Sequence, residues 1–148
     1  MRFSLEIMDA VRAAWPERLP LFLRISATDW TEGGSTPDDS VVLAKAAKQR
    51  GVDLIDCSSG GNVPKAKIPV GPGYQVPFAA KVKKEADIMT GAVGMITEAA
   101  QADKIIQTGE ADLVLLAREF LREPYWPLKA AKELGVPVHV AEQYRRAF

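Results

Sequence analysis

The sequence predicts an α/β fold in which four parallel strands alternate with helices. Short apolar runs alternate with segments of helical spacing along the whole chain. A glycine separates a helix end from the following segment at Gly51, Gly109 and Gly135. The chain has 148 residues, whereas a complete (β/α)8 barrel takes about 250. These observations leave a doubly wound sheet or a segment of a barrel as the candidate architectures.

The first half of the chain contains two helix–strand pairs. An apolar residue at every fourth position predicts an N-terminal helix with one buried face. These residues are Phe3, Ile7, Val11 and Trp15. A nearly continuous apolar run at 20–26 predicts a buried strand. Thr36 and Pro37 then supply an N-cap and a first-turn proline for a helix that ends near Gln49, and residues 52–57 repeat the strand pattern.

The second half of the chain repeats the same unit. We expect a helix near 77–86, a strand at 88–95, a helix at 97–108, a strand at 112–116 and a last helix at 125–134. Because each strand is followed by a helical segment, the strands pair in parallel through right-handed crossovers. We therefore expect residues 1–148 to form one domain.

Composition argues against several classes of function. Nineteen basic and nineteen acidic residues cancel, and no basic stripe with interleaved aromatic residues occurs, so we expect no nucleic-acid partner. The apolar runs are strand-sized and no signal-peptide core precedes the first helix, which predicts a cytoplasmic protein without a membrane partner. The single cysteine, Cys57, predicts no disulfide and no cysteine-based metal site, and we expect it to be buried in the core.

The end of the fourth predicted strand has the features of a phosphate site. Ala117 and Arg118 follow an apolar run and lead directly into the helix-prone segment 119–123. Small-residue backbone, a fixed positive charge and free helical N–H groups would therefore meet at one point. The third strand ends in a similarly small turn at Gly91, and the last two strands of a (β/α)8 barrel form such a phosphate site. The alternative interpretation of Arg118 is an exposed helix charge.

The first two strands also end in candidate residues. Alternation along the first strand points Arg24 away from the helices, where a guanidinium needs either a carboxylate, such as Asp56, or an anionic ligand. Ser59 and Gly60 follow the second strand at the edge where α/β folds bind ligands, although such a turn also forms for local reasons. Because the carboxyl ends of parallel strands meet at one edge, one pocket would be faced by Arg24, Ser59, Gly60, Gly91 and Arg118.

With these residues the chain resembles the Old Yellow Enzyme family of FMN-dependent oxidoreductases, particularly its thermophilic-like branch of ene-reductases. The similarity runs in order through residues 23–27, 51–60, 72–76, 91–97 and 111–124. It corresponds to the second half of the family's FMN-binding TIM barrel, roughly its fifth to eighth strands. The resemblance therefore implies half of a TIM (β/α)8 barrel, with four parallel strands alternating with helices.

The resemblance also implies roles for individual residues. Arg24 would lie beside the pyrimidine edge of FMN, where negative charge accumulates on reduction. The backbone at Ala117 and the side chain of Arg118 would hold the phosphate, although Ala117 stands where the family usually has glycine. The ribityl and phosphate side would be lined by Ser59, Gly60 and Gly91.

In the family reaction, NADPH or NADH reduces FMN, which then passes a hydride to an activated alkene such as an enone. Relatives carry the carbonyl-polarising histidine pair and the proton-donating tyrosine on the other half of the barrel. The resemblance thus implies no catalytic residue here and little or no activity of this chain alone. His139 is expected to pack or cap. Arg146 matches a C-terminal arginine that reaches the neighbouring subunit's active site, whereas taken alone it would be a solvated charge.

A half-barrel leaves its first and fourth strands as open edges and its inner face uncovered. We therefore expect a homo-oligomer, or a complement with the missing N-terminal half-barrel. Two other functions remain open at this point. One is a non-catalytic half-barrel that binds another phosphate or serves in assembly. The other is a phosphate-sugar enzyme, for which the strand ends offer no convincing catalytic Lys, Glu or His.

Overall fold

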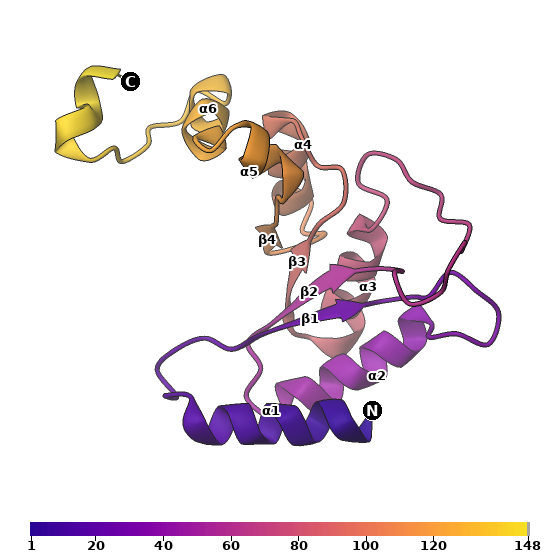
Figure 1. Ribbon diagram of the computed structural model, residues 1–148. Helices are drawn as coiled ribbons and strands as arrows, with labels where there is room; N and C mark the ends of the chain where they lie inside the picture. Colours follow the sequence, from indigo (N-terminus) through magenta and orange to yellow (C-terminus); the bar gives the residue numbers. More distant parts are fainter. Residues whose placement is uncertain (148) are drawn as a thin grey trace.

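The computed structural model describes residues 1–147 and contains one sheet of four parallel strands. The strands are β1 (Phe22–Ser26), β2 (Leu54–Ser58), β3 (Met89–Ala92) and β4 (Leu113–Val114). Their order in the sheet is β1-β2-β3-β4, so each strand lies beside its predecessor in the chain (Figure 1). A doubly wound sheet reverses its strand order at a switch point, whereas a barrel segment does not. The fold is therefore half of a TIM (β/α)8 barrel, as expected.

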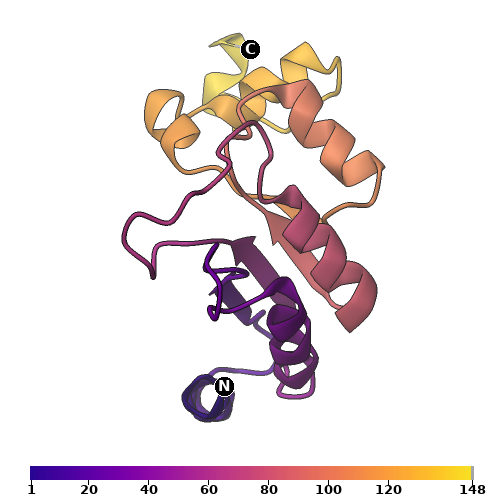
Figure 2. The same ribbon diagram turned by 90° about the vertical axis from the view of Figure 1, so that its right-hand side faces the viewer.

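Helices alternate with the strands as predicted. They are α1 (Arg2–Ala14), α2 (Pro37–Lys48), α3 (Val76–Ala86), α4 (Ala99–Gln107), α5 (Arg118–Arg122) and α6 (Trp126–Glu133), followed by a 3-10 helix η1 (Glu142–Ala147). Helices α2, α3 and α4 lie on one side of the sheet (Figure 2). Residues 136–147 extend away from the sheet as a C-terminal arm (Figure 1). No helix within residues 1–147 combines the length and the apolarity needed to cross a membrane.

The predicted start of α2 is confirmed in atomic detail. The hydroxyl of Thr36 accepts a hydrogen bond from the backbone N–H of Asp39 at 3.2 Å. The Asp39 carboxylate accepts one from the backbone N–H of Thr36 at 2.9 Å. Hydrogen bonds from the Thr36 hydroxyl and backbone lower the pKa of Asp39, so the carboxylate stays ionised and the reciprocal cap is complete.

The hydrophobic core lies between the outer face of the sheet and the helices. Ile55 and Cys57 on β2 are fully buried there, as Ala92 is on β3. The expected burial of Cys57 is thus confirmed. Burial, with the charge of neighbouring Asp56 adding to it, raises the pKa of this thiol to about 12. Because the thiolate is the reactive form, the only cysteine of the chain acts as a packing residue.

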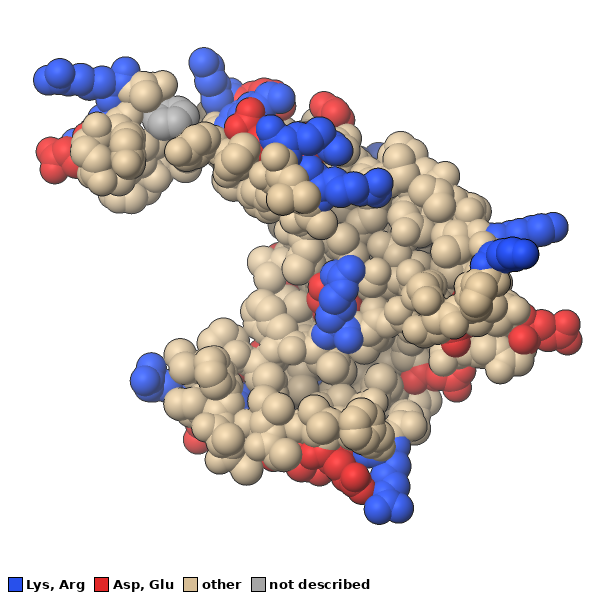
Figure 3. Space-filling model, viewed as in Figure 1, with Lys and Arg blue, Asp and Glu red and all other residues tan. Residues whose placement is uncertain are grey.

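The inner face of the sheet is open. Strand register places Phe22, Leu54 and Met89 in one row, and Arg24, Asp56, Gly91 and Leu113 in the next. Leu54 is buried, but Phe22 is 50% exposed, Met89 51% and Leu113 43%. Figure 3 shows the molecule hollowed between its N-terminal helix and its C-terminal arm. The chain therefore covers only the helical side of its sheet.

Two sequence expectations differ from the structure. The predicted buried stripe of the N-terminal helix is wrong, because Phe3, Ile7, Val11 and Trp15 are all exposed. Helix α1 meets α2 along a flank that buries Met8 instead, since periodicity shows which face is apolar but not what covers it. Strands β3 and β4 are also shorter than expected. Edge strand β4 bonds to β3 over two residue pairs only, which are Gly91–Leu113 and Ala92–Val114.

Candidate functional site

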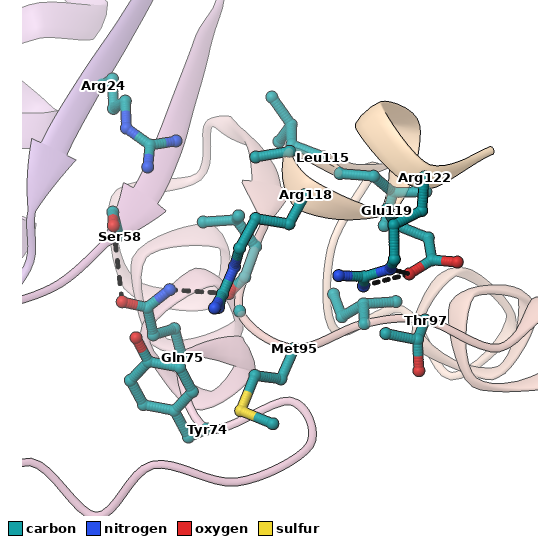
Figure 4. A pocket seen from close by; sticks show the side chains of 15 residues that line it. Arg24, Ser58, Tyr74, Gln75, Met95, Thr97, Leu115, Arg118, Glu119 and Arg122 are labelled. Carbon is teal, nitrogen blue, oxygen red and sulfur yellow. Dashed lines mark hydrogen bonds and ion pairs between the residues drawn. The ribbon is translucent and has the colours of Figure 1, made fainter. Parts of the chain in front are cut away.

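The carboxyl ends of the strands open onto one cavity of about 360 Å³. Its wall combines residues of β1 and β2 with residues of the loops that follow β2, β3 and β4 (Figure 4). Its lining residues include Arg24, Ser58, Gln75, Gly94, Ala117 and Arg118. Three of the residues predicted from the sequence, Arg24, Ala117 and Arg118, therefore share this cavity. They come from the two outermost strands of the sheet or the turns that follow them.

Arg24 projects from the inner face of β1 and pairs with a buried carboxylate. Its Nη1 lies 2.5 Å from Oδ2 of Asp56, whose side chain is 9% exposed, whereas the Arg24 side chain is 56% exposed. The structural partner considered from the sequence is thus present. A guanidinium carries five N–H donors, and this hydrogen bond uses one of them. Arg24 therefore keeps donors for an anionic group in the cavity.

The turn after β2 is arranged differently from the expectation. Ser58 lines the cavity, whereas Ser59 and Gly60 are not among its lining residues. The Ser59 hydroxyl donates to Oε1 of Gln75 at 2.7 Å. Gly60 adopts φ +68°, and a Cβ there would lie 2.8 Å from Cδ1 of Ile68. Glycine at this position therefore allows the positive φ and the close contact with Ile68 that the loop needs. The same loop turns Ser59 toward Gln75.

Gly91 lies on the inner face of β3 without lining the cavity. The side chain of Leu115 occupies the space that a Cβ at this position would need. The backbone N–H of Leu115 donates to the carbonyl of Ala92 at 2.8 Å, just beyond the end of β4. Gly91 thus leaves room for the side chain of Leu115 to lie against the inner face of β3, and Leu115 also lines the cavity.

The turn after β4 places charged side chains on the cavity. Arg118 opens α5, and Arg122 follows one turn later in an ion pair with Glu119. All three line the cavity. Ala117 has a φ of −107°, outside the left-handed region that favours glycine, so this backbone does not require glycine. With Arg24, three arginines and one glutamate line the wall, which favours an anionic ligand.

Ser58, Gln75 and Arg122 also line the cavity but were not predicted from the sequence. Arg122 lies four residues after Arg118, so helical spacing alone could have placed both on one face. Ser58 is two residues beyond inward-facing Asp56, so strand alternation could have found it. Gln75 had only a weak signal, because it ends a long loop immediately before the first residue of α3.

The C-terminal arm carries the other two residues singled out in the sequence. His139 is exposed and borders a second cavity of about 350 Å³, together with Tyr125, Leu128 and Tyr144. It was expected to pack or cap, but its side chain is exposed rather than packed in a core. Arg146 lies exposed in η1, away from the first cavity. Within residues 1–147 no group of three or more His, Cys, Asp or Glu side chains could hold a metal ion.

Comparison with known proteins identifies the family. The profile of the NADH:flavin oxidoreductase / NADH oxidase family matches residues 1–136. The chain belongs to this family. The NADPH dehydrogenase of Geobacillus sp. (strain WCH70) is 57% identical over 147 residues, which is 99% of this chain and 42% of that protein. The NADPH dehydrogenase of Halalkalibacterium halodurans is 52% identical over 99% of this chain and 43% of its own length. The chain thus spans about two fifths of these curated relatives.

A solved structure adds support for the fold alone. Rhamnonate dehydratase from Gibberella zeae superposes with a TM-score of 0.57 at 14% sequence identity. The match covers 98% of this chain and 33% of that chain. The family membership confirms the resemblance seen in the sequence, and the family's description names a flavin and a nicotinamide nucleotide.

Proposed function

We propose that this chain forms the phosphate and pyrimidine-edge part of the FMN site in an NAD(P)H-dependent oxidoreductase that reduces activated alkenes. The observation that carries this proposal is that Arg24 and Arg118 line one cavity at the carboxyl ends of the parallel strands. FMN has a phosphate dianion at one end and a ring that gains negative charge on reduction at the other. A ligand with two anionic regions matches a site with one arginine on β1 and another at the turn after β4.

The phosphate would bind at the turn after β4. Arg118 can present its planar fork of N–H donors to two phosphate oxygens at once. The carboxylate of Glu119 also lines the cavity and would repel a dianion, but Arg122 forms an ion pair with it. Arg122 thereby offsets the one negative charge near the phosphate position. The volume of about 360 Å³ is within the range of small-ligand sites.

The pyrimidine edge would lie against Arg24. The buried carboxylate of Asp56 holds this guanidinium through one N–H group, which leaves its other donors for the flavin. When bound, FMN supplies the hydride chemistry between NADPH or NADH and the alkene. No histidine lines the cavity in the part of the chain that the structure describes. We therefore propose that alkene reduction needs residues from outside this chain, which alone would have little or no activity.

The open inner face is the surface through which the barrel would be closed. We propose that it associates with the remaining part of the barrel or with a second copy of this chain, because β1 and β4 are both open edges. In such an assembly Arg146 on the C-terminal arm could reach a partner's site. Sedimentation velocity over a concentration series checks this proposal. If a second copy is the partner, the sedimentation coefficient should rise with concentration. A monomer at every concentration would contradict self-association and leave the remaining part of the barrel as the partner.

Titration of the purified chain with FMN tests the function directly. We expect the flavin fluorescence to change on binding, with an affinity for FMN at least roughly tenfold above that for riboflavin, which lacks the phosphate. The alternative function, a non-catalytic half-barrel that binds another phosphate, predicts no FMN binding but thermal stabilisation by inorganic phosphate. If neither FMN nor phosphate binds, the cavity is not a phosphate site.

A further inference from the structure

We propose that Gln75 is a positioning residue that fastens the loop after β2 to the loop after β3 and so fixes the wall of the cavity before a ligand enters. The hydrogen bonds of Gln75 that join the two loops do not depend on a ligand. Only their effect on flavin affinity rests on the proposed function. Gln75 immediately precedes α3 and is 3% exposed, and its side chain is drawn at the cavity in Figure 4.

The amide of Gln75 bridges three backbone segments. Its Oε1 accepts a hydrogen bond from the Ser59 hydroxyl at 2.7 Å and a longer one from the Ser58 hydroxyl at 3.4 Å. Its Nε2 donates to the backbone carbonyl of Val93 at 2.9 Å. One buried side chain therefore joins the end of β2, the start of α3 and the loop after β3.

The chemistry of the partners fixes the orientation of this amide. A backbone carbonyl can only accept, so Nε2 has to face Val93. With Nε2 at Val93, Oε1 faces Ser58 and Ser59, whose hydroxyls donate to it. A flipped amide would set two acceptors against each other at Val93. The short bond commits the Ser59 hydroxyl to Gln75, whereas Ser58, with the longer bond, lines the cavity and stays free to turn toward a ligand.

The loop after β3 is shaped to receive Gln75. Gly94 has a φ of +125°, and a Cβ there would lie 2.8 Å from Nε2 of Gln75 and 3.0 Å from the ring of Tyr74. The backbone N–H of Gly73 donates to the carbonyl of Gly94 at 2.9 Å, which adds a second link between the same loops. The absence of a side chain at Gly94 thus permits the close contact that the amide needs.

When the two loops are held together, the shape of the cavity between Arg24 and Arg118 is held constant too. Ser58, Gln75, Val93 and Gly94 line the same wall as Arg24 and Arg118. Without the amide, the Val93 carbonyl and the Ser59 hydroxyl would lose a buried partner and would have to move toward water. The two loops would then separate, and the distance between groups that contact the two ends of a ligand would vary.

Hydrogen exchange of the ligand-free chain tests the fastening. Gln75→Leu keeps a similar volume and removes every hydrogen bond of the side chain. We expect backbone amides in 58–62 and 93–97 to exchange about tenfold faster or more, with no change in α1 and α2. Gln107→Leu is the matched control, because Gln107 is exposed and, among residues 1–147, its amide bonds only to Asp103. Unchanged exchange in both loops of a folded Gln75→Leu chain would overturn the proposal.

A second variant covers the case in which Gln75→Leu does not fold. Ser59→Ala removes the short bond alone, so we expect faster exchange in 58–62 and little change in 93–97. The absence of that effect would overturn the proposal equally. In the flavin titration, Gln75→Leu should weaken FMN and riboflavin by a similar factor, because the wall rather than the phosphate contact is disturbed. If the wild-type chain binds no flavin, the proposed function fails, while the exchange experiment still decides the role of Gln75.

Discussion

Replacement of Arg118 by alanine is expected to weaken FMN binding about ten- to a hundredfold and to leave riboflavin binding nearly unchanged. Arg118 lines the cavity at the turn after β4, where we propose that the phosphate binds. A charge-assisted hydrogen bond stabilises by about 1.5–3 kcal/mol, which corresponds to this range of affinity. Fluorescence titrations with both flavins measure the effect, because only FMN carries the phosphate.

Two further variants separate the position of Arg118 from its charge. Arg2→Ala removes the same charge from α1, where the side chain is 91% exposed and does not line the cavity, and should leave both affinities unchanged. Arg118→Lys keeps the charge but loses the planar fork, so FMN affinity should fall between that of the wild type and that of Arg118→Ala. An equal loss of FMN and riboflavin affinity in Arg118→Ala would mean that Arg118 does not contact the phosphate.

The fold was predictable because its signals are local. Periodicity located the helices and the apolar runs, and Thr36 with Pro37 marked the start of α2 correctly. Periodicity cannot tell which surfaces find a partner, so the apolar stripe of α1, with Phe3 and Trp15, was expected to be buried and is exposed. Nor does it fix how far a strand pairs, and edge strand β4 (Leu113–Val114) therefore ended earlier than its apolar sequence suggested.

The candidate site was predictable only where side-chain direction follows from a regular element. Strand alternation directed Arg24 inward, and the end of β4 placed Arg118 at the cavity. Residue type alone could not show that the loop after β2 turns Ser59 toward Gln75. The path of that loop, residues 59–75, depends on contacts with the loop after β3, which no spacing in the sequence reveals. Gln75 therefore became visible only in three dimensions.

Truncation of Ile55 to alanine is expected to lower the free energy of unfolding by about 2–5 kcal/mol, measured by urea denaturation. Ile55 is fully buried on the outer face of β2, in register with Leu23 on β1 and Thr90 on β3. Alanine leaves a cavity between the sheet and the helices that the surrounding structure fills only in part. Since single domains are stabilised by about 5–15 kcal/mol, this loss is a large share of the total.

Met89→Ala is the matched control on the opposite face of the same sheet. Met89 is 51% exposed on the inner face, so its truncation should lower the free energy of unfolding of the monomer by well below about 1 kcal/mol. If Ile55→Ala and Met89→Ala lowered the free energy of unfolding equally at low protein concentration, the core would not lie only between the sheet and the helices. Repeating the measurement at several protein concentrations shows whether the inner face is open to solvent or covered by a second copy. If copies of the chain close the barrel, the cost of Met89→Ala should grow with protein concentration, because the partner then buries Met89, whereas the cost of Ile55→Ala should not.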